Sequence, residues 1–402
     1  MLLNGIKVIE HATYFAAPGA GGILSDWGAE VIKIEPPGGD PVRHNFPTKG
    51  TGKEHLTDNP AFDGDNRGKK SIVVDTRTED GREIVRKLAD TADVFLTNVR
   101  PGGIERSGLG YDILSRRNPR LVYCALTGYG LEGPDANAPG FDVASFWSRS
   151  GIARLTAPKG SELFPIRTAA GDHTTSITAV AAINAALIEA LKTGKGRLVD
   201  VSLLRTGLYT IHTDLAIQLF FDRIASTRPR AEAYNPLTNF FRTSDDAWIC
   251  IVARAGNSDL PRMARAFELP GIDTDERFTS GRARRDNAVV ITQMFDAAFA
   301  KFTRAEMAAR LNAEEIAWSP AQTLAEVAVD PQVIAAGGIV DMPSKTPGQT
   351  FRSPGGPARF VGADDGPKGP GPGLGEHSRE ILASVGYSGS EIDALMESKA
   401  VA

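Results

Sequence analysis

The first 130 residues alternate short apolar runs with segments of helical periodicity. Apolar runs at 7–10, 31–34, 71–75, 93–97 and 121–126 predict strands. Between them, residues 19–27 and 79–92 place apolar side chains at helical spacing. Strands that are separated by helices predict a parallel sheet covered by helices on both faces.

A long apolar segment follows this pattern. Residues 174–192 are rich in alanine and apolar almost all round, which predicts a largely buried helix. A strand at 198–201 and a further helix are expected after it. The apolar centre of the segment contains Asn184 and Glu189 and is shorter than the roughly 20 residues that span a bilayer. We therefore expect no membrane partner.

The C-terminal half has a different pattern of apolar and polar residues. Residues 239–252 alternate like a hairpin, and short amphipathic helices rich in Arg and Ala follow. Residues 343–374 hold many Gly and Pro residues and predict an extended crossing segment with few pairing options for its backbone. A last helix is expected at 376–385.

These sequence patterns predict that the chain has two domains and a C-terminal return segment. Residues 1–225 would form a large α/β domain, and residues 226–329 a smaller α+β domain. Residues 330–402 would form a return segment that completes the large domain. A chain of 402 residues suits two domains, because a single core rarely grows past about 250–300 residues.

Composition narrows the class of protein. Hydrophobic residues make up 42% and charged residues 23%, which is ordinary for a soluble globular protein. The net charge of −4 gives no electrostatic argument for a nucleic-acid partner. Two cysteines cannot build a disulfide framework, and the N-terminus has no secretory pattern. We therefore expect a cytoplasmic protein.

Several nucleotide and metal motifs are excluded. The turn around Gly19 and Gly21 carries Leu24 where a dinucleotide fingerprint needs its third glycine. The chain has no GxxxxGK[ST] loop and no GxSxG elbow, and its six histidines show no HExxH spacing. We expect neither a nucleotide nor a metal site. Taken alone, these patterns indicate a two-domain α/β protein of enzyme type.

Eight segments together carry a resemblance to a known family. They are residues 2–43, 66–75 (NRGKKSIVVD), 93–114, 118–134, 138–151, 171–203 (beginning GDHTTS), 275–287 and 373–382. In this order and spacing the chain resembles the class III CoA-transferase family, also called CaiB/BaiF. The family includes formyl-CoA, carnitine and 2-hydroxyacid CoA-transferases and the α-methylacyl-CoA racemases. The resemblance implies a Rossmann-like large domain built from both chain ends, a smaller α+β domain and an interlocked homodimer.

The resemblance also implies the catalytic residue. Asp172, in GDHTTS, matches the nucleophilic aspartate of the family. A carboxylate at the start of a long helix lies beside free N–H groups and the positive end of the helix dipole, which favour its ionised form. A simple capping role would suit the same position. Asp142 is a second candidate; it could orient an intermediate, bind the substrate or cap a helix.

Coenzyme A contacts follow from the same resemblance. The matching positions are Phe15, Ala16, Val74, Asp75, Thr76, Arg77, Asn98, Val99, Arg100 and Arg106. Arg67, Lys69 and Lys70 could also pair with its phosphates, or be solvated surface charges. Pro36 stands where some members carry a basic residue, so a contact there is in doubt.

The implied activity is the transfer of CoA from an acyl-CoA to a free carboxylic acid. The racemase branch carries a catalytic histidine where this chain has Phe141, and phenylalanine cannot accept a proton. Racemisation and a catalytically silent CoA-binding protein are the alternatives. Tyr14, Phe15, Phe141 and Trp147 would lie near the site and favour an acceptor with an apolar body, such as a 2-hydroxy or aryl acid.

Overall fold

The computed structural model describes residues 1–45, 57–167, 169–254 and 259–402. The chain divides into two compact units. Unit 1 comprises residues 1–153, 164–223 and 332–402, and unit 2 comprises residues 154–163 and 224–331.

A six-stranded sheet forms the centre of unit 1. Its strands are β1 (Lys7–His11), β2 (Glu30–Glu35), β3 (Lys70–Val73), β4 (Val94–Thr97), β5 (Val122–Thr127) and β6 (Leu198–Ser202). All neighbours pair in parallel, in the order β3-β2-β1-β4-β5-β6. The parallel sheet expected from the sequence is confirmed. The order reverses between β1 and β4, so the carboxyl ends of these two strands flank a crevice.

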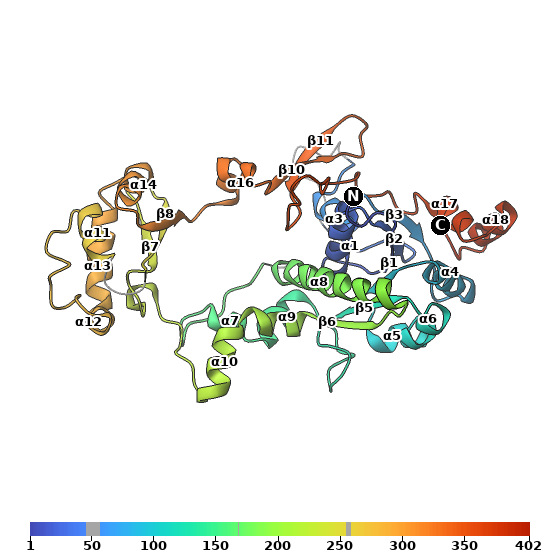
Figure 1. Cartoon of the computed structure of the whole chain (residues 1–402), viewed down its shortest axis with the longest axis horizontal. Coiled ribbons are helices and arrows are strands. Elements are labelled where there is room, and N and C mark those ends of the chain that lie inside the picture. Colours follow the sequence, from blue (N-terminus) through green and yellow to red (C-terminus); the bar gives the residue numbers. More distant parts are fainter. Residues whose placement is uncertain (46–56, 168, 255–258) are drawn as a thin grey trace. The chain divides into compact units, whose positions relative to one another are not determined.

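Helices cover both faces of this sheet (Figure 1). α1 (Ala16–Asp26) and α8 (Ala170–Thr193) pack on one face. α4 (Glu79–Asp90), α6 (Tyr111–Arg117) and α17 (Ser378–Ser384) pack on the other. Successive strand residues serve opposite faces, as Val8 and Ile9 do in β1. By length and composition alone α8 could cross a membrane, but one side of it is buried in this core.

Shorter elements complete unit 1. They are α2 (Val42–Asn45), α3 (Pro60–Asn66), α5 (Pro101–Arg106), the π-helix η1 (Val143–Arg149), α9 (Leu203–Thr210), α10 (His212–Phe221) and α18 (Gly389–Glu397). Two short helices, α7 (Ile152–Leu155) and α16 (Pro331–Ala335), contain residues of both units. Near the C-terminus, Val401 forms a β-bridge with Val74, so both ends of the chain build this unit.

The Gly- and Pro-rich segment differs from its expected form. β11 (Thr350–Pro354) lies inside it and pairs antiparallel with β10 (Ile339–Pro343). The expectation of few backbone pairing options was wrong for this stretch. Its partner strand begins just before the Gly- and Pro-rich region, where the composition still allows a strand.

Unit 2 is built on a three-stranded antiparallel sheet. β7 (Asn239–Arg242) and β8 (Trp248–Val252) form the expected hairpin, and β9 (Ala317–Pro320) pairs with β8. Its helices are η2 (Arg230–Glu232), α11 (Leu260–Ala266), α12 (Gly281–Asp286), α13 (Ala288–Phe299), α14 (Arg304–Ala313) and α15 (Leu324–Val327). Phe241, Phe267, Phe295 and Phe299 pack against one another in its core.

Candidate active site

The start of α8 is held by a side chain from a distant segment. Ala169 precedes the helix with a positive φ of 80° and provides no cap of its own. Asp142 supplies the missing acceptors: its carboxylate accepts the N–H groups of Ala169 at 2.9 Å and of Asp172 at 3.1 Å. Both groups would otherwise be among the unpaired donors of a helix N-terminus. Asp142 therefore fixes the turn that carries Asp172.

Close packing explains the glycine before Asp172. A Cβ atom at Gly171 would lie 2.2 Å from an Asp142 carboxylate oxygen and 2.3 Å from the Phe146 ring. No side chain fits there without displacing the cap. Gly171 lets the first turn of α8 lie directly against Asp142 and η1.

The expectation that the helix start favours the ionised form of Asp172 was wrong, because the N–H groups of Ala169 and Asp172 are bonded to Asp142 instead. Burial is the main cause that raises the pKa of Asp172 to about 7, and the negative charge of Asp142 adds to it. His173 opposes the shift. The His173 ring lies 3.1 Å from an Asp65 carboxylate oxygen, and this contact raises the pKa of the histidine. Carboxyl groups whose pKa lies near neutrality are typical of reactive sites.

Asp172 lines a cavity of about 570 Å³ at the carboxyl edge of the parallel sheet. The walls follow the ends of three strands: residues 13–16 after β1, 98–101 after β4 and 126–128 at the end of β5. Gly140, Phe141 and Asp142 close another side. This is the crevice where the strand order reverses, the usual position of ligands in open α/β sheets.

The candidate CoA contacts divide into two groups. Phe15, Ala16, Asn98, Val99 and Arg100 line the cavity together with Asp172. Val74, Asp75, Thr76, Arg77 and Arg106 do not line it.

The second group follows β3 or lies in α5. Val74 is buried, and Arg77 is an exposed side chain paired with Asp75 at 2.8 Å. Arg106 ends α5, the helix that follows β4.

Within the first group, the Asn98 amide forms two hydrogen bonds with the backbone of Thr13, at 2.6 and 3.1 Å. Asn98 thus fastens the loop after β1.

Two of the three further cations are not surface charges. Lys69 is buried and lies 2.6 Å from Glu10. Arg67 is buried against Asp26 at 2.5 Å. The charge of each is paired with a buried carboxylate of the same unit. Lys70 is partly exposed and pairs with Glu30 and Glu380.

The aromatic residues are only partly gathered at the site. Tyr14, Phe15 and Phe141 line the cavity, and the rings of Tyr14 and Phe141 meet edge to face with centroids 5.7 Å apart. Trp147 packs against the core of unit 1 instead.

A neighbouring cavity of about 630 Å³ shares Phe15 with the first and is lined by His173 and Asp65. Sequence analysis did not single out this pair, because its members lie 108 positions apart and belong to no motif. Over the described ranges, no group of three or more His, Cys, Asp or Glu side chains is placed to hold a metal ion.

Known proteins resemble this chain over nearly its whole length. The chain matches the family described as CoA-transferase family III over residues 3–378. It is 31% identical to an (R)-2-hydroxy-4-methylpentanoate CoA-transferase of Clostridioides difficile, over 100% of both chains. It is 30% identical to a cinnamoyl-CoA:phenyllactate CoA-transferase of Clostridium sporogenes, over 99% of this chain and 97% of that one.

Two further matches widen the range of named substrates and add a solved structure. A succinate–glutarate CoA-transferase of Agrobacterium fabrum is 32% identical over 95% of both chains. A crystal structure of a CaiB/BaiF family protein from Brucella suis superposes with a TM-score of 0.83 at 32% identity, covering 95% of this chain and 99% of that one. The chain belongs to the class III CoA-transferase family.

Proposed function

We propose that this enzyme transfers CoA from an acyl-CoA to a free carboxylic acid through a covalent intermediate on Asp172. The observation that carries the proposal is the position of Asp172. Its carboxyl group lines the crevice at the switch point of the sheet, on a helix turn that Asp142 holds in place. Membership of the family supports the overall reaction.

The proposed chemistry exchanges one thioester for another. The Asp172 carboxylate attacks the acyl-CoA carbonyl, the C–S bond breaks, and a mixed anhydride and CoA thiolate form. The thiolate then attacks the aspartyl carbonyl, which releases the donor acid and leaves an aspartyl-CoA thioester. The acceptor carboxylate attacks the carbonyl of this thioester, which releases CoA thiolate and forms a second anhydride between Asp172 and the acceptor. The thiolate then attacks the acceptor carbonyl of that anhydride and forms the new acyl-CoA. Asp172 returns as a carboxylate, and no nucleotide is consumed.

The two groups of candidate contacts suggest how the two ends of CoA are placed on unit 1. The thioester end would enter the cavity beside Phe15, Ala16 and Asp172. Arg100, at the end of β4, would meet a phosphate of the nucleotide end. The remaining candidates follow β3 or end α5. CoA is a long molecule, so we assign Arg106, whose helix begins at the cavity wall, and Arg77, which follows β3, to the parts of CoA beyond the thioester.

We propose that the acceptor is a mid-sized organic acid with an apolar body, such as a 2-hydroxy or aryl acid. Tyr14, Phe15 and Phe141 give the cavity apolar walls. Burying an aromatic or branched group against such walls contributes roughly 1.5–3 kcal/mol, or one to two decades in affinity. Two relatives are named for acids of this type. Racemisation has less support, because Phe141 supplies the cavity with no proton acceptor.

The functional unit would be an interlocked homodimer. α10 has no buried residue in the single chain, although Leu219, Phe220 and Phe221 are apolar. Ile177, Ile188 and Leu191 form an exposed apolar stripe on α8. Exposed apolar surface of this kind is typical of an interface, and a second copy of the chain is the proposed occupant.

We also propose a reducing compartment such as the cytoplasm, because Cys124 and Cys250 are free thiols.

A panel of acyl-CoA donors and carboxylate acceptors tests the proposed function. Each pair is incubated with the enzyme, and new acyl-CoA species are measured by mass. We expect CoA exchange, with kcat/KM for a branched 2-hydroxy acid or an aryl-propanoid acid above that for formate by about tenfold or more. A preference for formate would contradict the apolar acceptor. Absence of exchange across the whole panel would contradict the transferase proposal.

A further inference from the structure

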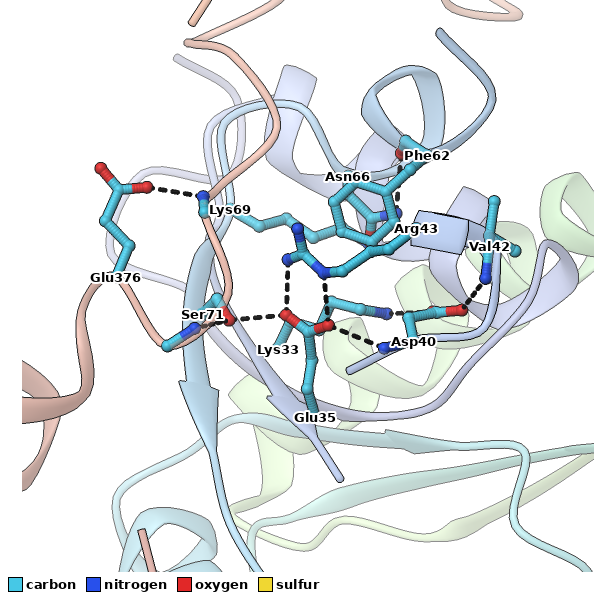
Figure 2. Close-up of polar contacts among 12 residues, drawn as sticks. Lys33, Glu35, Asp40, Val42, Arg43, Phe62, Asn66, Lys69, Ser71 and Glu376 are labelled. Carbon is cyan, nitrogen blue, oxygen red and sulfur yellow. Dashed lines mark hydrogen bonds and ion pairs between the residues drawn. The ribbon is translucent and has the colours of Figure 1, made fainter. Parts of the chain in front are cut away.

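A cluster of six charged side chains lies inside unit 1, beneath the loop that joins β1 to α1. Its members are Glu10, Lys33, Glu35, Asp40, Arg43 and Lys69, five of which are labelled in Figure 2. We use the name β1–α1 loop for residues 12–18, which comprise the connection after β1 and the first residues of α1. Five members of the cluster have fully buried side chains, and the sixth, Arg43, is 11% exposed.

The cluster is a balanced ion network. The Lys33 ammonium lies 3.0 Å from Glu10 and 3.0 Å from Asp40, and Lys69 lies 2.6 Å from the other oxygen of Glu10. Arg43 donates two hydrogen bonds to Glu35. Three acids thus face three bases. Burial lowers the pKa of Lys33, but Glu10 and Asp40 outweigh it and leave the pKa raised, so the lysine stays charged.

Such a network needs a reason beyond stability. Burying an ion costs several kcal/mol, and apolar side chains of similar volume are often at least as stabilising. What the network supplies here is a set of directed hydrogen bonds to one loop. Three of its members bond the loop backbone: Lys33 donates to the Ala12 carbonyl at 3.0 Å, Asp40 accepts from the Tyr14 N–H at 3.2 Å, and Lys69 donates to the Pro18 carbonyl at 2.8 Å.

The loop that receives these bonds is strained and lies at the active site. Tyr14 has a φ of 66°, a conformation that costs a bulky residue free energy and persists only where neighbours enforce it. Tyr14, Phe15 and Ala16 line the cavity of Asp172. On the other side, Ser176, one turn after Asp172, donates to the Ala16 carbonyl at 2.6 Å. The network and the catalytic helix therefore hold the same loop from opposite sides.

We propose that Lys33 and Asp40 are positioning residues that set the β1–α1 loop, and through it the CoA site. They touch no substrate; they act through the backbone of Ala12 and Tyr14. Without them Tyr14 relaxes from its left-handed conformation, and Phe15 and Ala16 leave the positions that face the thioester. The inference rests on the proposed function only in assigning the cavity to CoA.

The test compares Lys33→Met with a matched control, Lys345→Met. Lys345 also pairs with a fully buried carboxylate, Asp63, at 2.7 Å, but it lines neither cavity beside Asp172. Asp40→Asn serves as a milder second variant, because it keeps an acceptor for Tyr14 while it loses the charge that faces Lys33. The full-length proteins are examined by melting, hydrogen exchange of peptides covering residues 12–18, and calorimetric titration with free CoA.

We expect Lys33→Met to weaken CoA binding by about tenfold or more, with faster exchange in residues 12–18. Asp40→Asn should show a smaller change in the same direction. Lys345→Met should lower the melting temperature but change neither the affinity for CoA nor the hydrogen exchange of residues 12–18. Unchanged CoA affinity and exchange in both cluster variants, or equal changes in the control, would overturn the proposal. A wild-type protein that binds CoA without transferring it would contradict the proposed function instead, and the binding comparison would still decide the role of the loop.

Discussion

Asp172 combines two properties that are seldom found together in a carboxyl group. It is buried, and it lies close to a second carboxylate, Asp142, which accepts the backbone N–H groups of Ala169 and Asp172. Burial and the charge of Asp142 place its pKa at about 7, so the group changes its ionisation close to neutral pH. A carboxylate of higher basicity is also a better nucleophile once it is ionised.

The rate of transfer should therefore depend on pH in a stated direction. In the proposed mechanism only the ionised form of Asp172 attacks, so kcat/KM should rise about tenfold per pH unit below about pH 7 and level off above it. The measurement is the initial rate of CoA exchange between pH 5 and 8.5, corrected for hydrolysis of the thioester without enzyme. A flat profile, or one that falls from pH 5 to 7, would contradict this account of Asp172.

Some residue-level features could be predicted from the sequence and others could not. The resemblance singled out Asp172 and the loop after β1, because both lie in contiguous motifs. The pairing of His173 with Asp65 and the burial of Lys69 against Glu10 depend on which way side chains point in the folded chain. Neither the spacing of these residues nor their type carries that information.

At the scale of elements, α8 shows how a distant residue sets a local boundary. The apolar pattern predicted a helix over 174–192, whereas the helix begins at Ala170. The candidate cap, Asp172, lies inside the helix, and the N-cap residue is Ala169, whose side chain cannot accept a hydrogen bond. Asp142 provides the cap from 30 positions away by accepting the N–H of Asp172.

Removing that cap should affect stability and chemistry together. Asp142→Ala leaves the N–H groups of Ala169 and Asp172 without their acceptor, which should cost about 1–3 kcal/mol of unfolding free energy and lower kcat. Asp142→Asn keeps an acceptor and should recover part of the stability. Because the charge of Asp142 raises the pKa of Asp172, the midpoint of the pH–rate profile should move to lower pH in both variants.

Chemical denaturation and the pH–rate profile are the measurements for this prediction. Loss of activity in Asp142→Ala with unchanged stability and an unchanged midpoint would show that Asp142 acts directly on the substrate instead.

At the scale of the whole molecule, strands alternating with helices predicted the parallel sheet, and the sheet is confirmed. Its strand order could not be read from periodicity, because the same pattern suits several crossover topologies. The pairing of β10 with β11 was missed because Gly and Pro dominate the second strand's surroundings.

The interlocked dimer stays a prediction with a direct test. If two chains are threaded through one another, subunits cannot exchange without unfolding. Tagged and untagged protein, mixed under native conditions, should form no mixed dimers over days, and should form them after denaturation and refolding. Light scattering should give twice the mass of the 42.8 kDa chain. Rapid exchange would contradict linkage, and a monomer would leave the exposed apolar face of α10 without the occupant proposed for it.

The central claim is that CoA becomes covalently attached to Asp172. Hydroxylamine added during turnover should attack the aspartyl thioester, release CoA and leave a hydroxamate on the side chain. Peptide mass spectrometry of the trapped enzyme then locates the modification, with Asp172→Asn and enzyme without acyl-CoA as controls. We predict a hydroxamate on Asp172 that appears only with acyl-CoA present, and no transfer activity in the variant. Trapping at another carboxylate, or substantial activity in Asp172→Asn, would contradict the account.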